Sequence, residues 1–385
     1  MTPFETGRFR VSRRKLRPSI VPWRNQVTQK NSATVDHARQ EAFVGKLLEQ
    51  FSGTMSVLLA SLGDRLGLFK DLATRGPATS AELAKRTGLN ERYLREWLGG
   101  LAAAGYLTYD SGSRRFTLPA EHEAALAQEA GPMFVGGMLQ QLPALVGVFD
   151  DVAAAFKSGG GVPQSRYAPG FWDGLERFTA GWFENLLLPM WMPAMPDVRA
   201  HLERGADVAD VGCGRGRALI KLAGAFPRSR YVGFDNFGPT VTRATANARD
   251  AGVSKLVRFE ERDVSKGLPG KYHVITTFDV VHDAVDPLGL LKTIRNSLHP
   301  DGVYVCLDIN CGDTLEKNMN PFGALFHGVS TLYCMTTSLA NGGAGLGTLG
   351  FHETKVQELC GKAGFSSVRR VPMENPFNNL YEARP

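Results

Sequence analysis

Three alternate glycines, Gly212, Gly214 and Gly216, interrupt an apolar run in the stretch DVADVGCGRGRALIKLA at residues 207–223. The residues before them read as a strand, and those after them resume at helical spacing. A glycine turn between a strand and a helix leaves backbone amides bare at the helix N-terminus, where they can meet a small anionic group. The sequence therefore predicts a ligand-binding turn at this point.

The turn and two acidic positions restrict the ligand. The dinucleotide fingerprint needs a further glycine where this chain has Arg217, and no Gly-Lys-Ser or Gly-Lys-Thr phosphate loop occurs in the chain. Asp235 ends a second predicted strand, where a carboxylate can accept both hydroxyls of a ribose. Asp263 and Val264 follow a third predicted strand and suit the amine and the flat face of an adenine. S-adenosylmethionine, which has ribose, adenine and a short carboxylate-bearing arm without phosphate, fits this set.

Residues 206–383 resemble the class I S-adenosylmethionine-dependent methyltransferases, in which a glycine turn, two acidic strand ends and a terminal hairpin follow in this order. With the N-terminal module described below, most of residues 40–383 is similar to the small-molecule O-methyltransferases of plants and actinobacteria. The resemblance implies that Asp210 and the glycine backbone hold the methionine part of the cofactor, and that S-adenosylhomocysteine is a product. It also implies that Thr277 and Phe278 offer backbone carbonyls beside the methionine end.

A histidine just beyond the fourth predicted strand is the candidate base. His282 lies in TTFDVVHDAVDP at residues 276–287, where the plant O-methyltransferases place a catalytic His-Asp pair. A histidine near its ordinary pKa is suited to take a phenolic proton. Asp308 could orient it, as an acidic residue does in those enzymes; the alternative is a helix-surface or capping histidine. Ala284 stands where those enzymes usually have a tryptophan, which leaves the shape of the acceptor pocket open.

The insert at residues 318–353 is predicted to form the wall and lid of the acceptor pocket, with the glycines of residues 342–350 as a hinge. It would lie over the carboxyl edge of the sheet, where open α/β folds bind ligands. The alternative is an extra packing or dimer segment. An apolar lining predicts an aromatic or lipid-like acceptor. The predicted pocket residues are Met319, Phe322, Phe326, Tyr333 and Met335.

The elements that position these residues follow from the alternation of strand and helix patterns after residue 206. This alternation predicts an α/β fold with a seven-stranded, Rossmann-like sheet covered on both faces. The last two strands, SVRRV and NLYEA, are too close in sequence for a crossover helix and should form an antiparallel hairpin. The other strands are predicted at 207–211, 230–234, 256–260, 273–277 and 302–308, and the helices at 216–225, 239–251, 287–298 and 353–363.

Residues 36–130 are predicted to form an all-α and winged-helix domain. A helix is expected over residues 36–75, Thr79 and Glu82 form a capping box, and Asn90 can cap the next helix. The segments YLTYD and RRFTL flank the turn SGS and would supply the wing. The helix after Asn90 is expected to bury Tyr93, Leu94, Trp97, Leu98 and Leu101.

A winged helix raises the alternative of a DNA-binding regulator that uses the S-adenosylmethionine fold as a sensor. A helix that faces phosphates needs net positive charge, and this one is balanced. Packing and homodimerisation are therefore the expected roles. The charged residues of the candidate recognition helix are Glu91, Arg92, Arg95 and Glu96.

A further alternative concerns the methyl acceptor: the chain could be an N- or C-methyltransferase without a dedicated base.

Charge and cysteine usage bound the remaining classes. Residues 1–30 carry eight Lys or Arg and one acid, which is a net charge of +7. The whole chain has a formal net charge of +6, so the rest of the chain is near neutral and nucleic acid is not an expected partner. Residues 1–35 are predicted as a basic disordered tail, with a transit peptide as the alternative. No apolar run is long enough to span a bilayer. Five cysteines without a CxxC pair predict free thiols, no metal and a cytoplasmic location.

The expected division of the chain is therefore the tail over 1–35, the winged-helix dimerisation domain over 36–130, a helical linker over 131–200 and the methyltransferase domain over 201–385. The linker is rich in aromatic residues, a composition more typical of a core or a subunit interface than of a ligand cage.

Overall fold

The computed structural model describes residues 35–373 and 375–385, so the tail predicted over residues 1–35 lies outside the described residues apart from its last position. The chain divides into two compact units, residues 1–51 and 52–385, which are considered separately. In the first unit the described residues form the beginning of helix α1 (His37–Arg65), which continues into the second unit. Apolar side chains on this part of α1, among them Phe43, Leu47 and Phe51, are exposed.

The second unit opens with the predicted winged-helix module, which we define as residues 52–130. The Thr79 hydroxyl accepts a hydrogen bond from the Glu82 amide, and the Glu82 carboxylate accepts one from the Thr79 amide, so the capping box is confirmed. The Asn90 side chain caps the following helix, as predicted. After α1 the elements of the module are α2 (Leu68–Arg75), α3 (Ser80–Thr87), α4 (Glu91–Ala103), β1 (Thr108–Asp110), β2 (Arg115–Thr117) and α5 (Ala120–Leu126).

Two predictions for this module are wrong in detail. The expected helix over residues 36–75 is two helices, because the chain turns at Gly67, whose φ of +70° is left-handed and incompatible with a continuous helix. Tyr93 is 80% exposed rather than buried. Successive side chains on a helix point about 100° apart, and Tyr93 precedes the first residue of the apolar stripe. The buried residues of that stripe are Leu94, Trp97, Leu98 and Leu101.

The predicted seven-stranded sheet with an antiparallel C-terminal hairpin is confirmed. Its strands run in the order β5-β4-β3-β6-β7-β9-β8, parallel from β5 to β7 and antiparallel at β9 and β8. From β3 the chain moves outward through β4 to β5 and then returns to β6 on the other side of β3. Such a reversal opens a crevice at the carboxyl ends of β3 and β6. The strands are β3 (Asp207–Val211), β4 (Arg230–Asp235), β5 (Val257–Glu261), β6 (Tyr272–Phe278), β7 (Leu298–Ile309), β8 (Ser367–Val371) and β9 (Asn378–Arg384).

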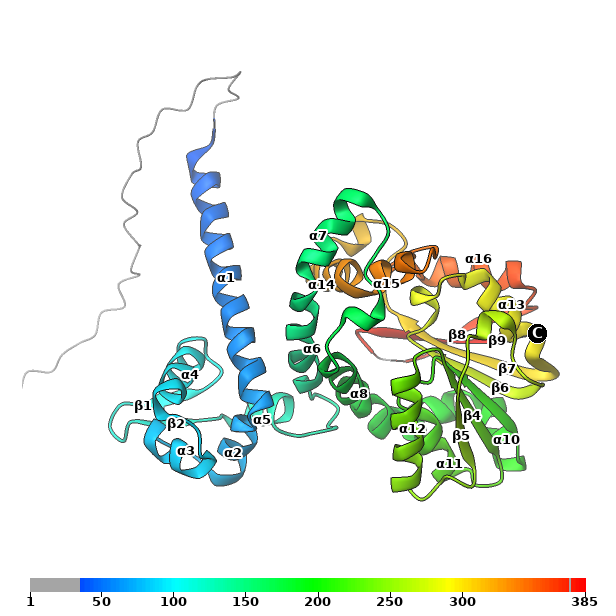
Figure 1. Cartoon of the computed structure of the whole chain (residues 1–385), viewed down its shortest axis with the longest axis horizontal. Coiled ribbons are helices and arrows are strands. Elements are labelled where there is room, and N and C mark those ends of the chain that lie inside the picture. Colours follow the sequence, from blue (N-terminus) through cyan, green and yellow to red (C-terminus); the bar gives the residue numbers. More distant parts are fainter. Residues whose placement is uncertain (1–34, 374) are drawn as a thin grey trace, which may run out of the picture. The chain divides into compact units, whose positions relative to one another are not determined.

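Helices cover both faces of the sheet because successive strand residues point to opposite sides. Val208 packs into a core with α10 and α11, whereas Ala209 packs into a second core with α13 and α16. Figure 1 shows these helices on the two sides of the sheet. The helices of the sheet domain are α10 (Pro196–Arg204), α11 (Arg217–Ala225), α12 (Gly238–Asp250), α13 (Pro287–Ser297), α14 (Pro321–Val329), α15 (Met335–Ala340) and α16 (Glu353–Ala363).

A helical linker joins the module to the sheet domain. A β-carbon on Gly137 of α6 would overlap the backbone nitrogen of Phe178 in α8, and one on Gly174 would lie 2.6 Å from the Gly137 carbonyl oxygen. The backbones of α6 and α8 therefore approach each other closely. The linker helices are α6 (Gly136–Gly147), α7 (Phe149–Ser158), α8 (Gly170–Trp182), a π-helical segment (Phe183–Trp191) and α9 (Met192–Ala194).

Two further expectations agree with the structure. All five cysteines are free. Among the helices of residues 35–373 and 375–385, none is long and apolar enough to cross a membrane.

Candidate active site

The glycine turn joins β3 to α11 and has the conformation that only glycine adopts easily. Gly212, Gly214 and Gly216 have φ values of +69°, +50° and +78°. A β-carbon on Gly216 would overlap the ring of Phe259, and one on Gly212 would lie 2.6 Å from a methyl group of Val280. The turn is thus restricted to glycine at these two positions both by backbone conformation and by space.

Two carboxylates lie against the turn. Asp235, at the end of β4, accepts hydrogen bonds from the Gly214 amide and the Phe237 amide, both at 2.9 Å. Asp210, near the end of β3, accepts a hydrogen bond of 2.6 Å from the Thr276 hydroxyl. Burial raises the pKa of Asp210 to about 7 and also raises the pKa of Asp235. The expectation of bare amides in the turn is wrong, because the Gly212 amide donates to the Phe234 carbonyl at 2.8 Å, the Gly214 amide to Asp235 and the Gly216 amide to the Cys213 carbonyl at 2.9 Å. These hydrogen bonds fix the turn beside the two carboxylates.

Asp263 is exposed and its carboxylate is partly engaged. Oδ1 accepts hydrogen bonds from the Ser265 amide at 3.0 Å and the Ser265 hydroxyl at 2.6 Å, and Oδ2 lies 3.6 Å from the Lys266 ammonium. Hydrogen bonds from Ser265 are the main cause of the lowered pKa of Asp263. Asp263 therefore caps a short turn and, at the same time, lines the cavity together with Val264.

The cavity has a volume of about 500 Å³ and lies at the crevice between β3 and β6. Gly216 and Thr277 do not line it. Thr277 is fully buried, and its hydroxyl lies 2.7 Å from the Tyr304 hydroxyl. The predicted cofactor residues that do line the cavity are Asp210, Gly212, Gly214, Asp235, Asp263, Val264 and Phe278.

His282 lies in the wall of the same cavity, on a short turn after β6, and is buried. Its Nδ1 is 2.6 Å from Oδ1 of Asp308, the contact expected from the sequence. Its Nε2 is 3.2 Å from Oδ1 of Asp283, which has no hydrogen bond among the described residues. Burial lowers the pKa of His282, but the carboxylates of Asp283 and Asp308 outweigh burial and leave this pKa well above its ordinary value.

One acidic neighbour of His282, Asp279, escaped the sequence analysis, whereas Asp283 is the aspartate of the His-Asp pair that the resemblance implied. The Asp279 carboxylate accepts a hydrogen bond of 2.6 Å from the side-chain amide of Asn378, and the Asp279 backbone has a left-handed φ of +56°. Burial, together with the nearby Asp308 carboxylate, raises the pKa of Asp279 to about 8. Burial also raises the pKa of Asp283. Asp279 lies three positions before His282 in the sequence. This spacing alone does not show that a left-handed backbone turn at Asp279 brings its carboxylate to His282.

The predicted acceptor residues divide into two groups. Phe326 and Tyr333 line the cavity, whereas Met319, Phe322 and Met335 do not. Phe322 is 45% exposed on α14, and Met319, which lies in the turn before that helix, is 76% exposed. The sequence analysis missed aromatic residues of the linker, which it assigned to a core or a subunit interface. Those that line the cavity are Phe171, Trp172, Phe178, Trp182 and Phe183.

Two family models match the chain. Residues 54–128 match a model described as Rv2258c-like winged HTH domain, and residues 202–358 match one described as Methyltransferase domain. Among curated proteins, the acetylserotonin O-methyltransferase of Mus musculus is 25% identical over 90% of this chain and 90% of its own length. The polyketide synthase ThaQ of Burkholderia thailandensis is 33% identical, but the match covers 29% of this chain and only 5% of that protein.

Solved structures share the fold. The mitomycin 7-O-methyltransferase MmcR has a TM-score of 0.67 at 18% identity, over 91% of this chain and 100% of its own. Human N-acetylserotonin methyltransferase, solved in complex with S-adenosylmethionine, has a TM-score of 0.67 at 17% identity, over 92% and 99% of the two chains. A winged-helix module followed by a methyltransferase domain of this topology places the chain among the class I S-adenosylmethionine-dependent methyltransferases, whose cofactor is S-adenosylmethionine.

Proposed function

We propose that this enzyme transfers the methyl group of S-adenosylmethionine to the hydroxyl oxygen of a small, largely apolar or aromatic acceptor. The proposal rests on His282, which lines the cavity that also contains the glycine turn and is held 2.6 Å from Asp308. A hydroxyl group has to lose its proton when it is methylated, and a buried imidazole beside a carboxylate can accept that proton. Transfer to an amine or a carbon, the alternative considered above, does not require this pair.

The residues of the turn fit the cofactor, because Gly212 and Gly214 line the cavity without side chains and so admit close approach of a ligand to the backbone. Bound S-adenosylmethionine supplies an electrophilic methyl group on a sulfonium. We assign the methionine part to the glycine turn and Asp210, and the ribose hydroxyls to Asp235. The remaining proposed contacts come from Asp263 and Val264 toward the adenine, and from the backbone carbonyl of Phe278 toward the methionine end. Thr277, which does not line the cavity, is left out of this assignment.

The proposed reaction is a displacement at carbon. The acceptor oxygen forms a bond to the methyl group while the sulfur–methyl bond breaks, and S-adenosylhomocysteine leaves. The hydroxyl proton goes to Nε2 of His282, which faces Asp283 without a hydrogen bond to it, while Nδ1 stays with Asp308. Alignment of acceptor and donor within the aromatic wall of the cavity lowers the activation barrier further, an effect that can reach about 7 to 11 kcal/mol.

The acceptor class follows from the wall of the cavity. Trp172 packs on Phe237 at 4.9 Å between ring centroids, and Phe171 packs on Tyr333 at 4.4 Å. These ring pairs come from the linker, the sheet domain and the insert, and all four rings line the cavity. Aromatic walls of this kind favour flat, apolar ligands.

The decisive experiment combines cofactor titration with an acceptor screen. Calorimetry should show that the full-length protein binds S-adenosylmethionine and S-adenosylhomocysteine. A panel of phenols, indoles and aliphatic amines is then screened for S-adenosylhomocysteine release with methyl-labelled cofactor, and the label is located by mass spectrometry. Label on oxygen of an aromatic acceptor supports the proposal, and label on nitrogen or carbon contradicts it.

Cofactor affinity should depend on pH through Asp210, whose pKa is raised by burial to about 7. S-adenosylmethionine carries a net positive charge, so it binds the ionised carboxylate better, and Kd should rise as the pH falls from about 8 to 6. The same raised pKa stabilises the free protein at low pH, and this contribution is lost as the pH rises through about 7. Calorimetry across this range measures the effect.

In Asp210→Asn the affinity for S-adenosylmethionine should be weaker and its pH dependence reduced. A change of Kd with pH equal to that of the wild type would contradict the assignment of Asp210 to the methionine part of the cofactor.

We also propose that the protein is a homodimer. Exposed apolar side chains on α1, among them Leu47 and Phe51, suit contact with a second copy. Light scattering after size exclusion should give twice the monomer mass, and the double variant Leu47→Asp, Phe51→Asp should give the monomer mass. A wild-type protein of monomer mass would contradict the proposal.

The winged helix offers little for DNA. On α4 the four charged side chains pair with each other, Arg95 with Glu91 and Arg92 with Glu96, each at 2.5 Å. The helix that would face phosphates therefore presents no net positive charge. We propose a role for this module within the enzyme instead.

A further inference from the structure

Helix α8 contacts the cofactor turn through one buried carboxylate. The Glu176 side chain is 8% exposed and accepts hydrogen bonds from Arg215 at 2.9 Å and from Arg217 at 3.0 Å. These arginines are the residues that follow Gly214 and Gly216. Asn247 of α12 also donates to Glu176, at 3.1 Å, and to the Arg215 carbonyl oxygen, at 3.1 Å. The Asp173 carboxylate of α8, whose side chain is 48% exposed, also lies 2.6 Å from the Arg215 guanidinium. Glu176 is therefore the buried carboxylate, and the one that contacts both arginines, through which the linker holds the second half of the glycine turn.

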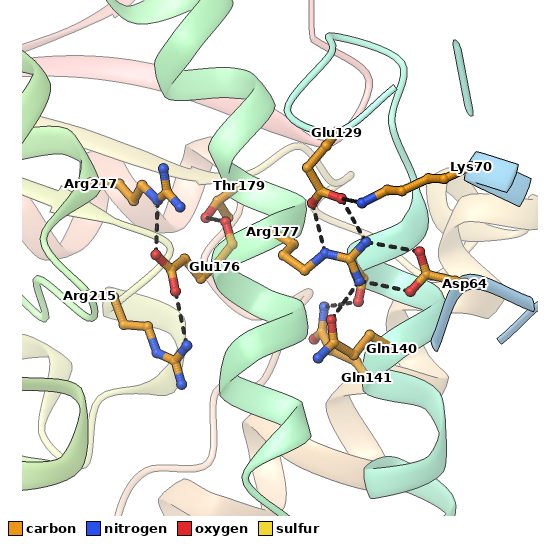
Figure 2. Close-up of polar contacts among 11 residues, drawn as sticks. Asp64, Lys70, Glu129, Gln140, Gln141, Glu176, Arg177, Thr179, Arg215 and Arg217 are labelled. Carbon is orange, nitrogen blue, oxygen red and sulfur yellow. Dashed lines mark hydrogen bonds and ion pairs between the residues drawn. The ribbon is translucent and has the colours of Figure 1, made fainter. Parts of the chain in front are cut away.

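The next residue of α8, Arg177, points to the other side of the helix, toward the winged-helix module. Figure 2 shows the two networks on opposite sides of α8. The Arg177 guanidinium donates to both carboxylate oxygens of Asp64, at 2.7 and 2.9 Å. It also donates to both oxygens of Glu129, at 2.7 and 2.9 Å, and to the Gln140 side chain at 2.6 Å. Lys70 of α2 donates to Glu129 at 2.7 Å.

The geometry of these contacts is directional. A planar guanidinium that donates in pairs to two carboxylates fixes the orientation of its helix more strictly than a single ion pair does. The Asp64 side chain is 2% exposed and that of Arg177 23%, so this ion pair is screened less by salt than the contacts of Glu129, whose side chain is 39% exposed. Arg177 does not line the cavity.

Helix α8 cannot slide to accommodate a change on one side only. The contact between Gly174 of α8 and Gly137 of α6 leaves no room for a β-carbon on either residue. Close backbone packing of this kind transmits displacement rather than absorbing it. A shift at Arg177 should therefore move Glu176, and with it the arginines of the turn.

We propose that α8 is a rigid connector through which the winged-helix module positions the cofactor turn, with Glu176 and Arg177 as adjacent positioning residues. The inference rests on the cofactor position assigned above. It gives the winged-helix module a role in cofactor binding that is separate from dimerisation and from nucleic-acid binding. Loss of either residue should weaken cofactor binding, even though Arg177 lies outside the cavity.

The test measures cofactor affinity in the full-length protein. Glu176→Gln should raise Kd for S-adenosylmethionine by about tenfold or more, because charge-assisted hydrogen bonds to both arginines are weakened. Arg177→Gln should raise Kd by about fivefold, and Arg177→Lys, which keeps the charge but not the paired geometry, should fall between it and the wild type. KM for the cofactor should rise in parallel, while kcat at saturating cofactor stays near the wild-type value.

Arg166→Gln is the matched control. It removes another paired arginine–aspartate contact, that of Arg166 with Asp151 at 3.0 and 3.1 Å, which holds α7 and not α8. Its Kd should equal that of the wild type. An unchanged Kd in folded Arg177→Gln would overturn the inference, as would an equal loss in Arg166→Gln. If Arg177→Gln does not fold, hydrogen exchange is measured instead at the amides of the glycine turn in Arg177→Lys. Exchange there that is no faster than in the wild type would overturn the inference.

A double variant tests whether the two residues act in series. If α8 is the connector, Glu176→Gln combined with Arg177→Gln should raise Kd by clearly less than the product of the single effects. A full product would mean that the residues act independently and would contradict the connector. Wild-type protein that fails to bind S-adenosylmethionine would instead refute the proposed function, so the two failures are distinguishable.

Discussion

Replacing His282 by glutamine should lower kcat for methyl transfer to a hydroxyl acceptor by at least about a hundredfold, the usual contribution of a general base. Glutamine can still donate to Asp308, so the turn after β6 should keep its shape. Kd for S-adenosylmethionine should stay within about twofold of the wild type, since His282 has no contact with the glycine turn among the described hydrogen bonds. Single-turnover kinetics and calorimetry separate these two quantities.

The matched control is His327→Gln, because His327 is an exposed histidine of α14 that does not line the cavity. Its kcat should equal that of the wild type. Unchanged kcat in His282→Gln would end the assignment of a base and favour an enzyme that works by alignment alone.

The pH profile gives a second readout for His282. Burial lowers its pKa, but the carboxylates of Asp283 and Asp308 outweigh burial and raise this pKa well above its ordinary value. A base acts only in its unprotonated form, so kcat should rise with pH through and above neutrality. Asp308→Asn removes one of the two carboxylates, so the rise should move to lower pH, with a lower plateau because orientation is lost. A profile that is the same in Asp308→Asn and the wild type would contradict this.

That the proposed cofactor residues meet at one cavity could be predicted from the sequence, because the fold brings them together. Gly212, Asp235 and Asp263 each follow a strand of one parallel sheet, and the carboxyl ends of such strands share an edge. No knowledge of side-chain packing was needed to bring them together. The contact of His282 with Asp308, which the resemblance implied, agrees with this placement, since His282 follows β6 and Asp308 lies near the end of the neighbouring strand β7.

The acceptor side could not be predicted in the same way. Trp172 reaches the cavity from a helix outside the sheet, and its partner Phe237 is 65 positions away with no local pattern to connect them. The apolar residues of the insert show the same limit: Phe326 lines the cavity and Phe322 does not, although both lie on α14. Helix orientation decides this difference, and orientation is set by tertiary packing.

Glu176 and Arg177 illustrate the limit for charged residues. Both lie on a helix whose sequence reads as an ordinary amphipathic element, and their partners are between 37 and 113 positions away. A charge that is buried by tertiary contact has the same local sequence context as one that faces water. The burial of the Glu176 carboxylate, and its contacts with two arginines, therefore could not be predicted from the sequence and are known only from the structure.

Asp235→Asn should raise Kd for S-adenosylmethionine by about a hundredfold or more, because hydrogen bonds to a charged acceptor contribute roughly 1.5 to 3 kcal/mol each and a ribose offers two hydroxyls. The structure adds a second cause. Oδ2 accepts from the Gly214 amide and Oδ1 from the Phe237 amide, so an asparagine NH₂ group has to face one of these N–H donors. The substitution therefore disturbs the glycine turn as well as the sugar contact, and hydrogen exchange at Gly214 should become faster.

Asp250→Asn is the control for this effect, since Asp250 is an exposed aspartate at the end of α12, and its Kd should not change. S-adenosylhomocysteine shares the ribose, so its affinity should fall by the same factor as that of S-adenosylmethionine in Asp235→Asn. Equal losses for both ligands locate the defect at the sugar and the turn rather than at the methyl group. A loss confined to S-adenosylmethionine, or no loss for either, would show that the carboxylate of Asp235 does not bind the ribose.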